Sequence, residues 1–185
     1  QIEKKHYPLA ARAAVVDALS ETGLSKIQVA SFVSPKAVPT MADAAELFAA
    51  IKKKPGVTYT PLYLNAKGFE RARQVSEVDM EGRIHFYTTD QFALQNNNRP
   101  AAQVRDDQIA MIDLCVEHGV PLEGAYIMTA FGCNLTGEVP LSAITDLALW
   151  TAEQCRVRQM PLPTIVLADT VGWASPDDVK RRVNA

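Results

Sequence analysis

The sequence predicts an α/β fold built on a parallel sheet, and two observations carry that prediction. Short apolar or β-branched runs alternate with amphipathic stretches along the 185 residues, and a helix signal follows each predicted strand. This alternation is typical of parallel βαβ units. The second observation is the connection at residues 31–43, which is longer than the roughly 2–6 residues that such loops need. The connection follows the carboxyl end of the predicted strand at 27–29. Because binding sites in parallel α/β folds lie at the carboxyl ends of the strands, the long loop predicts a binding surface.

Two strands and three helices are predicted in the first half of the chain. The elements in order are a helix from Pro8, a strand at 27–29, a helix over 44–51, a strand at 57–64 and a short helix from Lys67. Gly23 stands where a helix C-terminus favours glycine, so it ends the first helix. The Thr40-x-x-Asp43 spacing predicts a capping-box start for the second.

Three further strands, each followed by a helix, are predicted in the second half. The strands are expected at 83–88, 123–129 and 164–168, and the helices over 106–118, from Ser142 and from Ser175. The last start is the best defined, because proline at the first helical position and acids in the first turn are typical of helix N-termini.

The count of units leaves two architectures open. There is no break in composition, so residues 1–185 are expected to form a single domain. A (β/α)8 TIM barrel typically has about 250 residues, and this chain has room for roughly five of its eight units. The pattern therefore fits either a small open sheet or an incomplete barrel. Unpaired sheet edges would make the isolated segment prone to aggregation.

Composition excludes several classes of protein. The net charge is −2, from 19 basic and 21 acidic residues that are mixed along the chain, so no footprint for nucleic acid or an anionic membrane is expected. Cys115, Cys133 and Cys155 lie far apart without C-x-x-C spacing, which argues against a disulfide framework or a zinc site. No secretory signal or membrane-spanning stretch is visible, although the chain opens at Gln1 without an initiator Met.

Polar or small residues follow every predicted strand, and we expect them to face one pocket. They are Gln28 and Ser31, Asn65 and Lys67, Thr88 to Asp90, Thr129 with Gly132 and Cys133, and Asp169 with Thr170. Turns at such strand ends are also polar for structural reasons. Asp169 could orient a substrate hydroxyl or a metal-bound water, or it could accept backbone N–H groups of its own turn. Cys133 has no adjacent His or Lys to lower its pKa, which favours a structural role.

Several common motifs are absent. The three histidines, His6, His85 and His118, lack ligand spacing and are expected to be structural. Neither a glycine-rich phosphate loop nor a G-x-S-x-G nucleophile elbow occurs.

Several motifs in a fixed order give the chain a family resemblance. They are Gly23-Leu24-Ser25-x-Ile27, the run from Ser31 to Asp43, Leu64-Asn65-x-Lys67-Gly68-Phe69-Glu70, Phe131-Gly132-Cys133 with Gly137, and Asp169-Thr170-Val171-Gly172 followed by Ser175-Pro176. The sequence resembles the 3-hydroxy-3-methylglutaryl-CoA lyases, which belong to the DRE-TIM metallolyases. The resemblance spans essentially the whole chain and implies an incomplete TIM barrel, roughly strands two to six.

The resemblance implies a retro-Claisen cleavage of an acyl-CoA substrate to acetoacetate and acetyl-CoA. It also implies a divalent cation, Mg²⁺ or Mn²⁺, which stabilises the developing charge. No nucleic-acid or membrane partner is expected, and a homo-oligomer is left open. The compartment expected is the cytoplasm, or the mitochondrial matrix in a eukaryote, with a place in leucine degradation.

The resemblance also assigns roles to residues. It implies catalytic positions at Gln28 and Asp169, substrate-binding positions at Ser31, Asn65 and Thr170, and a structural role for Cys133. The family carries Glu where this chain has Gln28, a neutral isostere that cannot balance metal charge or accept a proton. The family's metal-binding His-x-His and catalytic Cys correspond to positions after 185, and its Arg-Asp pair to positions before Gln1. The segment alone is therefore expected to be inactive.

Two other functions remain open at this point. Gln28 motivates a related carbon–carbon lyase or condensing enzyme that acts on another 3-hydroxyacyl thioester. The third alternative is a non-catalytic homologue that serves as a binding or scaffold protein.

Overall fold

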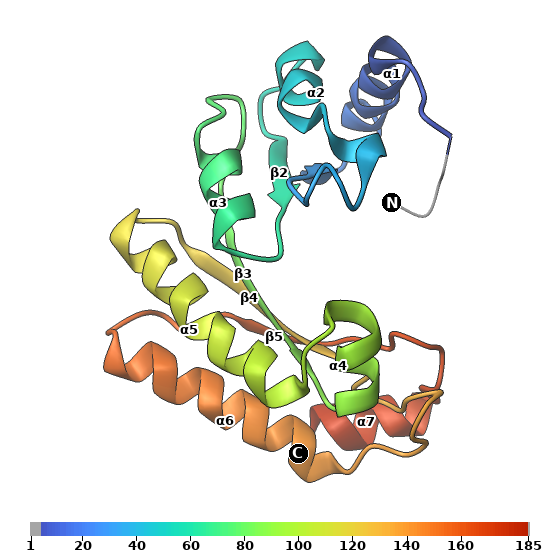
Figure 1. Ribbon diagram of the computed structural model, residues 1–185, viewed down its shortest axis with the longest axis vertical. Coiled ribbons are helices and arrows are strands. Elements are labelled where there is room, and N and C mark those ends of the chain that lie inside the picture. The colour runs from blue at the N-terminus through green and yellow to red at the C-terminus, as the bar shows by residue number, and fades with distance from the viewer. Residues whose placement is uncertain (1–4, 185) are drawn as a thin grey trace. The chain divides into compact units, whose positions relative to one another are not determined.

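The structure is a computed structural model that describes residues 5–184. Figure 1 shows helices and strands alternating along the chain. The elements in order are α1 (Leu9–Ser20), β1 (Lys26–Ser31), the 3₁₀ turn η1 (Pro39–Met41), α2 (Ala44–Ala50), β2 (Thr58–Leu62), α3 (Ala66–Arg73), β3 (Gly82–Tyr87), α4 (Asp90–Asn97), α5 (Ala101–Glu117), β4 (Leu122–Met128), α6 (Leu141–Val157), β5 (Thr164–Leu167) and α7 (Pro176–Val183).

The chain divides into two compact units, Gln1–Glu81 and Gly82–Ala185. The first contains a sheet of β1 and β2, and the second a sheet in the order β3-β4-β5. Every pairing in both sheets is parallel. The predicted α/β class with parallel strands is therefore confirmed, while the expectation of a single domain stays a prediction.

In the first unit, α1 and α2 pack against each other and against β1. Tyr59 of β2 is fully buried, and its hydroxyl lies 2.8 Å from Ser20 Oγ and accepts a hydrogen bond from the Lys54 backbone N–H at 2.9 Å. The strand register skips Val29, which forms a bulge between Gln28 and Ala30. Gln28 pairs with Thr60 and Ser31 with Leu62, so this bulge puts Gln28 and Ser31 on the same face of the sheet.

In the second unit, α5 and α6 lie side by side against one face of the three-stranded sheet (Figure 1). An ion pair of 2.7 Å between Arg158 and Asp113 joins these two helices. Phe86 of β3 meets Trp150 of α6 edge to face, with ring centroids 5.4 Å apart. Alternate residues of the strands are completely buried, as their apolar sequence runs require: Ile84 and Phe86 in β3, and Ala125 and Ile127 in β4.

Two local predictions in the sequence were wrong. The helix expected from residue 106 begins at Ala101, and α4, which was not predicted, precedes it. The capping box expected at Thr40-x-x-Asp43 does not form. Residues 39–41 make a 3₁₀ turn, and Asp43 is the N-cap of α2 without a side-chain cap bond. Its carboxylate instead accepts from Arg12 of α1, because a charged guanidinium is a stronger donor to a carboxylate than a neutral backbone amide.

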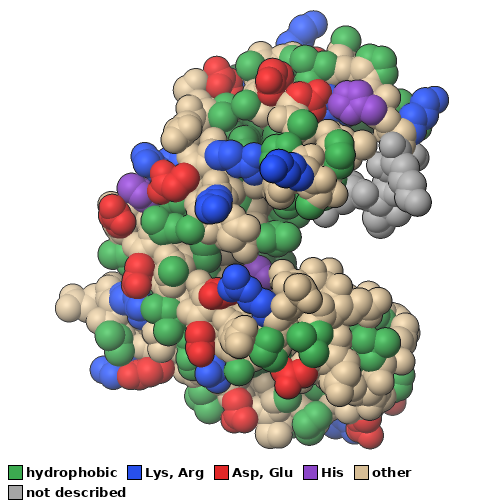
Figure 2. Space-filling model, in the orientation of Figure 1, with side chains coloured by type: hydrophobic (Ala, Val, Ile, Leu, Met, Phe, Trp, Pro, Cys, Tyr) green, Lys and Arg blue, Asp and Glu red, His purple; other side chains and the backbone are tan. Residues whose placement is uncertain are grey.

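The surface mixes charges of both signs. Figure 2 shows acidic and basic side chains interspersed with apolar ones over the visible face of each unit. Among residues 5–184, no helix combines the length and the apolar character that crossing a membrane requires.

Candidate active site

Three threonines form a hydrogen-bonded chain across the carboxyl ends of β3, β4 and β5. Thr88 Oγ1 lies 2.8 Å from Thr129 Oγ1, and the Thr129 backbone N–H donates to Thr170 Oγ1 at 2.7 Å. Thr129 is fully buried and has a positive φ of 56°, a left-handed conformation that is rare for a β-branched residue. The bond to Thr170 holds this strained turn in place. The hydroxyl predicted to bind substrate is therefore part of the framework of the loops.

Asp169 follows β5 and is exposed to solvent. Its Oδ1 accepts the backbone N–H of Trp173 at 2.8 Å, and its Oδ2 accepts that of Ala174 at 3.2 Å. The carboxylate thus closes its own turn, which was one of the two roles considered from the sequence. An ionised carboxylate has about four lone-pair sites, so these two bonds leave acceptor capacity on the solvent side.

The loop after β4 is closed by a short antiparallel bridge. The Cys133 N–H donates to Gly137 O at 2.9 Å, and the Gly137 N–H donates back to Cys133 O at 2.7 Å. The Cys133 side chain is fully buried. Burial raises the pKa of this thiol, but hydrogen bonds from Thr89, Thr136 and the Leu135 N–H outweigh that effect, so its pKa lies below the ordinary value. Sequence analysis could not anticipate this lowered pKa, because one of the donors, Thr89, lies 44 residues away in the chain.

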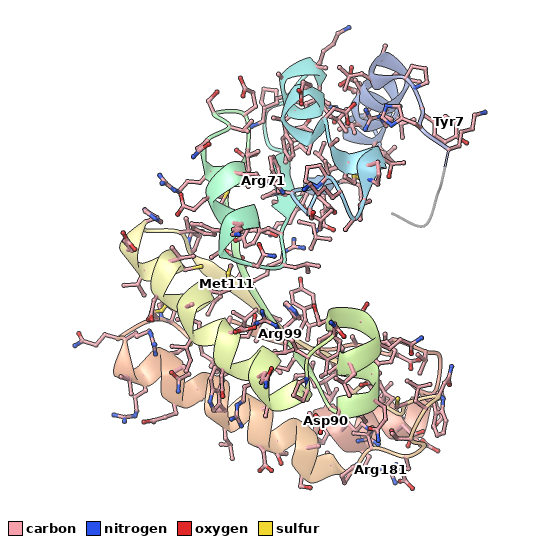
Figure 3. The ribbon with its side chains drawn as sticks, in the orientation of Figure 1. Tyr7, Arg71, Asp90, Arg99, Met111 and Arg181 are labelled. Atoms are coloured by element: carbon pink, nitrogen blue, oxygen red, sulfur yellow. The ribbon has the colours of Figure 1, made fainter. Side chains whose placement is uncertain are left out.

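In the first unit, α3 joins the loops that follow β1 and β2. Asn65 caps α3 by accepting the Gly68 N–H on Oδ1 at 2.9 Å. Gly68 approaches the end of β1 so closely that a Cβ there would lie 2.7 Å from Phe32 O. Arg71, labelled in Figure 3, donates to Phe32 O at 2.5 Å and to Val33 O at 2.7 Å. The start of the 31–43 loop is therefore anchored by α3, which sequence analysis did not anticipate.

Two predicted site residues of this unit, Gln28 and Asn65, keep unused hydrogen-bonding groups. Gln28 is exposed, and its amide has no partner among residues 5–184; neither does the Nδ2 of Asn65. The neighbour of Gln28 in the register, Thr60, is fully buried, and its hydroxyl also lacks a partner in the described chain. Ser31 is 6% exposed at the end of β1. Gln28, Ser31 and Asn65 thus lie on the segments that end β1 and β2.

The described side chains include no cluster of the usual metal ligands. Among residues 5–184, no group of three or more His, Cys, Asp or Glu residues is close enough together to hold a metal ion. The residues present therefore do not by themselves fit the divalent cation that the resemblance implies, and the cation stays a prediction.

Comparison with curated proteins gives matches over the whole chain. No protein-family model matches it. It is 34% identical over 187 residues to the 3-hydroxy-3-isohexenylglutaryl-CoA/hydroxymethylglutaryl-CoA lyase of Pseudomonas aeruginosa, and 30% identical over 185 residues to the mitochondrial hydroxymethylglutaryl-CoA lyase of Gallus gallus. Both matches cover 100% of this chain and 59% of the relative. The chain thus spans a little more than half the length of these relatives.

Solved structures give the same result. The HMG-CoA lyase of Brucella melitensis matches with a TM-score of 0.84 at 29% identity, covering 100% of this chain and 62% of that one. An HMG-CoA lyase of Acinetobacter baumannii, solved with coenzyme A and 3-methylmalate, matches with a TM-score of 0.82 at 29% identity, covering 99% of this chain and 57% of that one. The fold is accordingly that of an incomplete TIM barrel. In sequence and in fold, the chain is a relative of the hydroxymethylglutaryl-CoA lyases.

Proposed function

We propose that the protein is a carbon–carbon lyase that cleaves 3-hydroxy-3-methylglutaryl-CoA to acetoacetate and acetyl-CoA. The observation that carries this proposal is the match over 100% of the chain to proteins named for that reaction, at up to 34% identity. The polar residues at the strand ends of both units add support, because reactions in parallel β/α folds occur at that edge.

The proposed reaction is a retro-Claisen cleavage. A base takes the proton of the tertiary hydroxyl, the bond between C2 and C3 breaks, and its electron pair passes to the thioester as an enolate. The new C=O group belongs to acetoacetate, and protonation of the enolate gives acetyl-CoA. The enolate needs donors or positive charge held ready around its oxygen, in a site from which water is excluded.

We assign separate roles to Gln28, Ser31 and Asn65 of the first unit. The Asn65 Nδ2 is a donor without a partner among residues 5–184, while its Oδ1 is fixed by the helix cap, so the amide is held ready to bind a substrate oxygen. Gln28 presents both an amide donor and an acceptor from β1. The buried Ser31 shapes the end of the same strand.

Asp169 and Thr170 fix the loops through the bonds described above. We propose that the solvent-facing side of the Asp169 carboxylate also accepts a substrate hydroxyl. Thr170 then serves substrate binding by holding the Thr129 turn in its left-handed conformation.

A divalent cation is part of the proposal for the whole protein. Mg²⁺ or Mn²⁺ would polarise the substrate oxygens when bound. Because residues 5–184 contain no cluster of three or more His, Cys, Asp or Glu side chains, we propose that ligands outside this range complete its site. Gln28 contributes at most a neutral amide near it, where the family resemblance implies a carboxylate.

The test is cleavage of 3-hydroxy-3-methylglutaryl-CoA by the intact protein, with acetoacetate measured after addition of Mg²⁺ or Mn²⁺ and after chelation. We expect release of acetoacetate that requires the cation. Absence of cleavage at all cation concentrations by a protein that is folded by circular dichroism would contradict the proposal and favour a non-catalytic homologue.

A second substrate is supported by a specific observation. The relative from Pseudomonas aeruginosa is named for 3-hydroxy-3-isohexenylglutaryl-CoA as well as for the methyl compound, and Gln28 departs from the acid that the resemblance implies. A larger value of kcat/KM for the isohexenyl compound than for the methyl compound would assign the protein to longer acyl chains.

The setting of the reaction is also a proposal. Relatives are named as mitochondrial and as cytoplasmic enzymes. We infer the matrix for a eukaryotic source and the cytoplasm for a bacterial one, where the reaction would serve leucine degradation. Fractionation followed by immunoblotting checks the compartment, and size-exclusion chromatography with light scattering measures the number of subunits.

A further inference from the structure

The loop after β5 contains a tryptophan that is fixed from three sides. The Trp173 indole Nε1 donates to Asn134 Oδ1 at 2.7 Å, and its backbone N–H donates to Asp169 at 2.8 Å. Gly132 packs closely against the ring. A Cβ at this position would lie only 2.3 Å from Trp173 Cε3. Only glycine leaves room for the indole there. The ring therefore joins the loops that follow two neighbouring strands, β4 and β5.

Trp173 nevertheless remains 43% exposed as a residue. Leu135, which is 52% exposed, follows Asn134 in the partner loop and adds apolar surface. An immobilised aromatic side chain has already lost its conformational freedom, so a ligand that contacts it meets a smaller entropic cost. The indole offers a broad apolar contact in a defined orientation. These properties are those of a preorganised binding surface for a neutral, partly apolar group.

The charges around this ring disfavour a phosphate group as the ligand. The cations of α7 each have a partner: Lys180 pairs with Asp177 at 4.0 Å, and Arg181 pairs with Asp178. Arg182 donates from Nη2 to Val139 O at 2.9 Å and lies over the Phe131 ring at 5.7 Å, while its Nε and Nη1 are buried without a partner among the described residues. The carboxylate of Asp169 is bonded to the Trp173 backbone and adds negative charge. A diphosphate near the ring would thus meet the negative charge of Asp169.

We propose that Trp173 binds the uncharged pantetheine arm of a coenzyme A thioester. The inference rests on the proposed function, since it takes the substrate to be an acyl-CoA. The acyl group reacts at the carboxyl ends of the strands, so the arm that carries it leaves across the loops that Trp173 joins. Among similar structures, the Acinetobacter baumannii lyase was solved with coenzyme A bound. Trp173 binds the arm and takes no part in proton transfer.

The kinetic test uses Trp173→Ala in the intact protein with 3-hydroxy-3-methylglutaryl-CoA. We expect KM to rise about tenfold, the effect of losing one aromatic contact, while kcat changes less than twofold. Gly132→Ala keeps the indole but displaces it, and it should raise KM in the same way. Trp150→Phe, on the helix side of the sheet, is the matched control and should leave both constants unchanged. A fall in kcat at constant KM in Trp173→Ala would overturn the proposal.

A binding test separates this inference from the proposed function. The chain has two tryptophans, so the emission of Trp173 is the difference between Trp150→Phe and the double variant Trp150→Phe/Trp173→Phe. Coenzyme A and pantetheine should both change this emission, and adenosine 3′,5′-bisphosphate should not. If coenzyme A and pantetheine change the emission of Trp173 in a protein that cleaves no substrate, Trp173 does contact the pantetheine arm but the proposed function is wrong. A response to the bisphosphate alone, or no response to coenzyme A, overturns the contact itself.

Discussion

The two units hold their strand ends in different ways. In the second unit, side chains bond to one another and to the backbone across neighbouring loops, as Thr88, Thr129 and Thr170 do. In the first unit, one helix does this work: α3 anchors the end of β1 through Arg71 and the close approach of Gly68. In the first unit, Gln28, Thr60 and the Asn65 Nδ2 consequently retain donors without a partner among the described residues, whereas Thr129, Asp169 and Thr170 of the second unit bond to the loops. The comparison teaches that the same position after a strand can supply either ligand contacts or scaffolding.

The largest expected effect comes from filling the contact between α3 and β1. In Gly68→Val, the new Cβ would lie 2.7 Å from a backbone oxygen, which cannot rotate away. We expect the free energy of unfolding to fall by about 3 kcal/mol, as for severe overpacking. Activity should also be lost, because displacing residue 68 breaks its hydrogen bond to Asn65 and releases the Asn65 side chain. Urea denaturation measures the first and the acetoacetate assay the second. Lys67→Val, at the exposed neighbouring position, should cost less than about 1 kcal/mol; equal losses in both variants would show that α3 is not an anchor.

The next effect concerns the threonine chain of the second unit. Thr170→Val removes the acceptor of the Thr129 N–H but keeps the shape of the side chain. A buried donor left without a partner costs about 1–3 kcal/mol, so the midpoint of urea denaturation should fall accordingly. Thr170→Ser retains the hydroxyl and should restore most of the loss. Wild-type stability in Thr170→Val would mean that the strained Thr129 turn needs no support from this bond.

A smaller effect links stability to pH in the first unit. The hydrogen bond from Arg12 lowers the pKa of Asp43, and burial only partly opposes it. A carboxyl whose pKa is lower in the folded state stabilises the protein above its unfolded pKa, near 3.8. This contribution is lost as the pH falls through the lower, folded value. In Asp43→Asn, thermal melts between pH 2 and 6 should lack this component, which is worth less than about 1 kcal/mol for a partly exposed pair. Parallel pH curves for both proteins would refute the assignment.

The smallest effect on stability is expected at Gln28. Its exposed amide has no partner among the described residues, so Gln28→Ala should change the free energy of unfolding by no more than about 0.5 kcal/mol. Activity is expected to respond much more strongly, with kcat/KM reduced at least about tenfold through loss of one hydrogen bond to a reacting group. Gln28→Glu provides the second arm, because it adds the charge that the family resemblance implies. Full activity in Gln28→Ala would show that Gln28 takes no part in binding or cleaving the substrate.

The sequence was informative about elements with strong periodicity and uninformative about those held by distant contacts. All five strands occur where β-branched or apolar runs predicted them. Helix α4 was missed because the polar residues that end and follow it, Asn96 to Arg99, resemble a loop. In the folded chain, Asn96 and Asn97 donate to the Tyr87 hydroxyl, and Asn98 ends the helix with a positive φ of 56°. These partners lie in another element, so local propensity could not reveal the helix.

The same limit applies to the candidate site. The positions after each strand were predictable, since parallel strands direct their carboxyl ends to one edge. What each side chain does there was not, because Asn134 and Trp173 are 39 residues apart and Thr129 and Thr170 are 41 apart. Only the tertiary structure separates the donors that are engaged from those that remain available.

The enclosed thiols of the second unit have a practical consequence. Cys115, Cys133 and Cys155 are each at most 2% exposed and none forms a disulfide. Alkylating reagents should therefore modify none of the three without a local opening of the backbone, even though hydrogen bonding favours the thiolate of Cys133. The rate at which iodoacetamide labels each cysteine therefore reports how often the segment around that cysteine opens. Peptide mass spectrometry can measure the three labelling rates in a single sample.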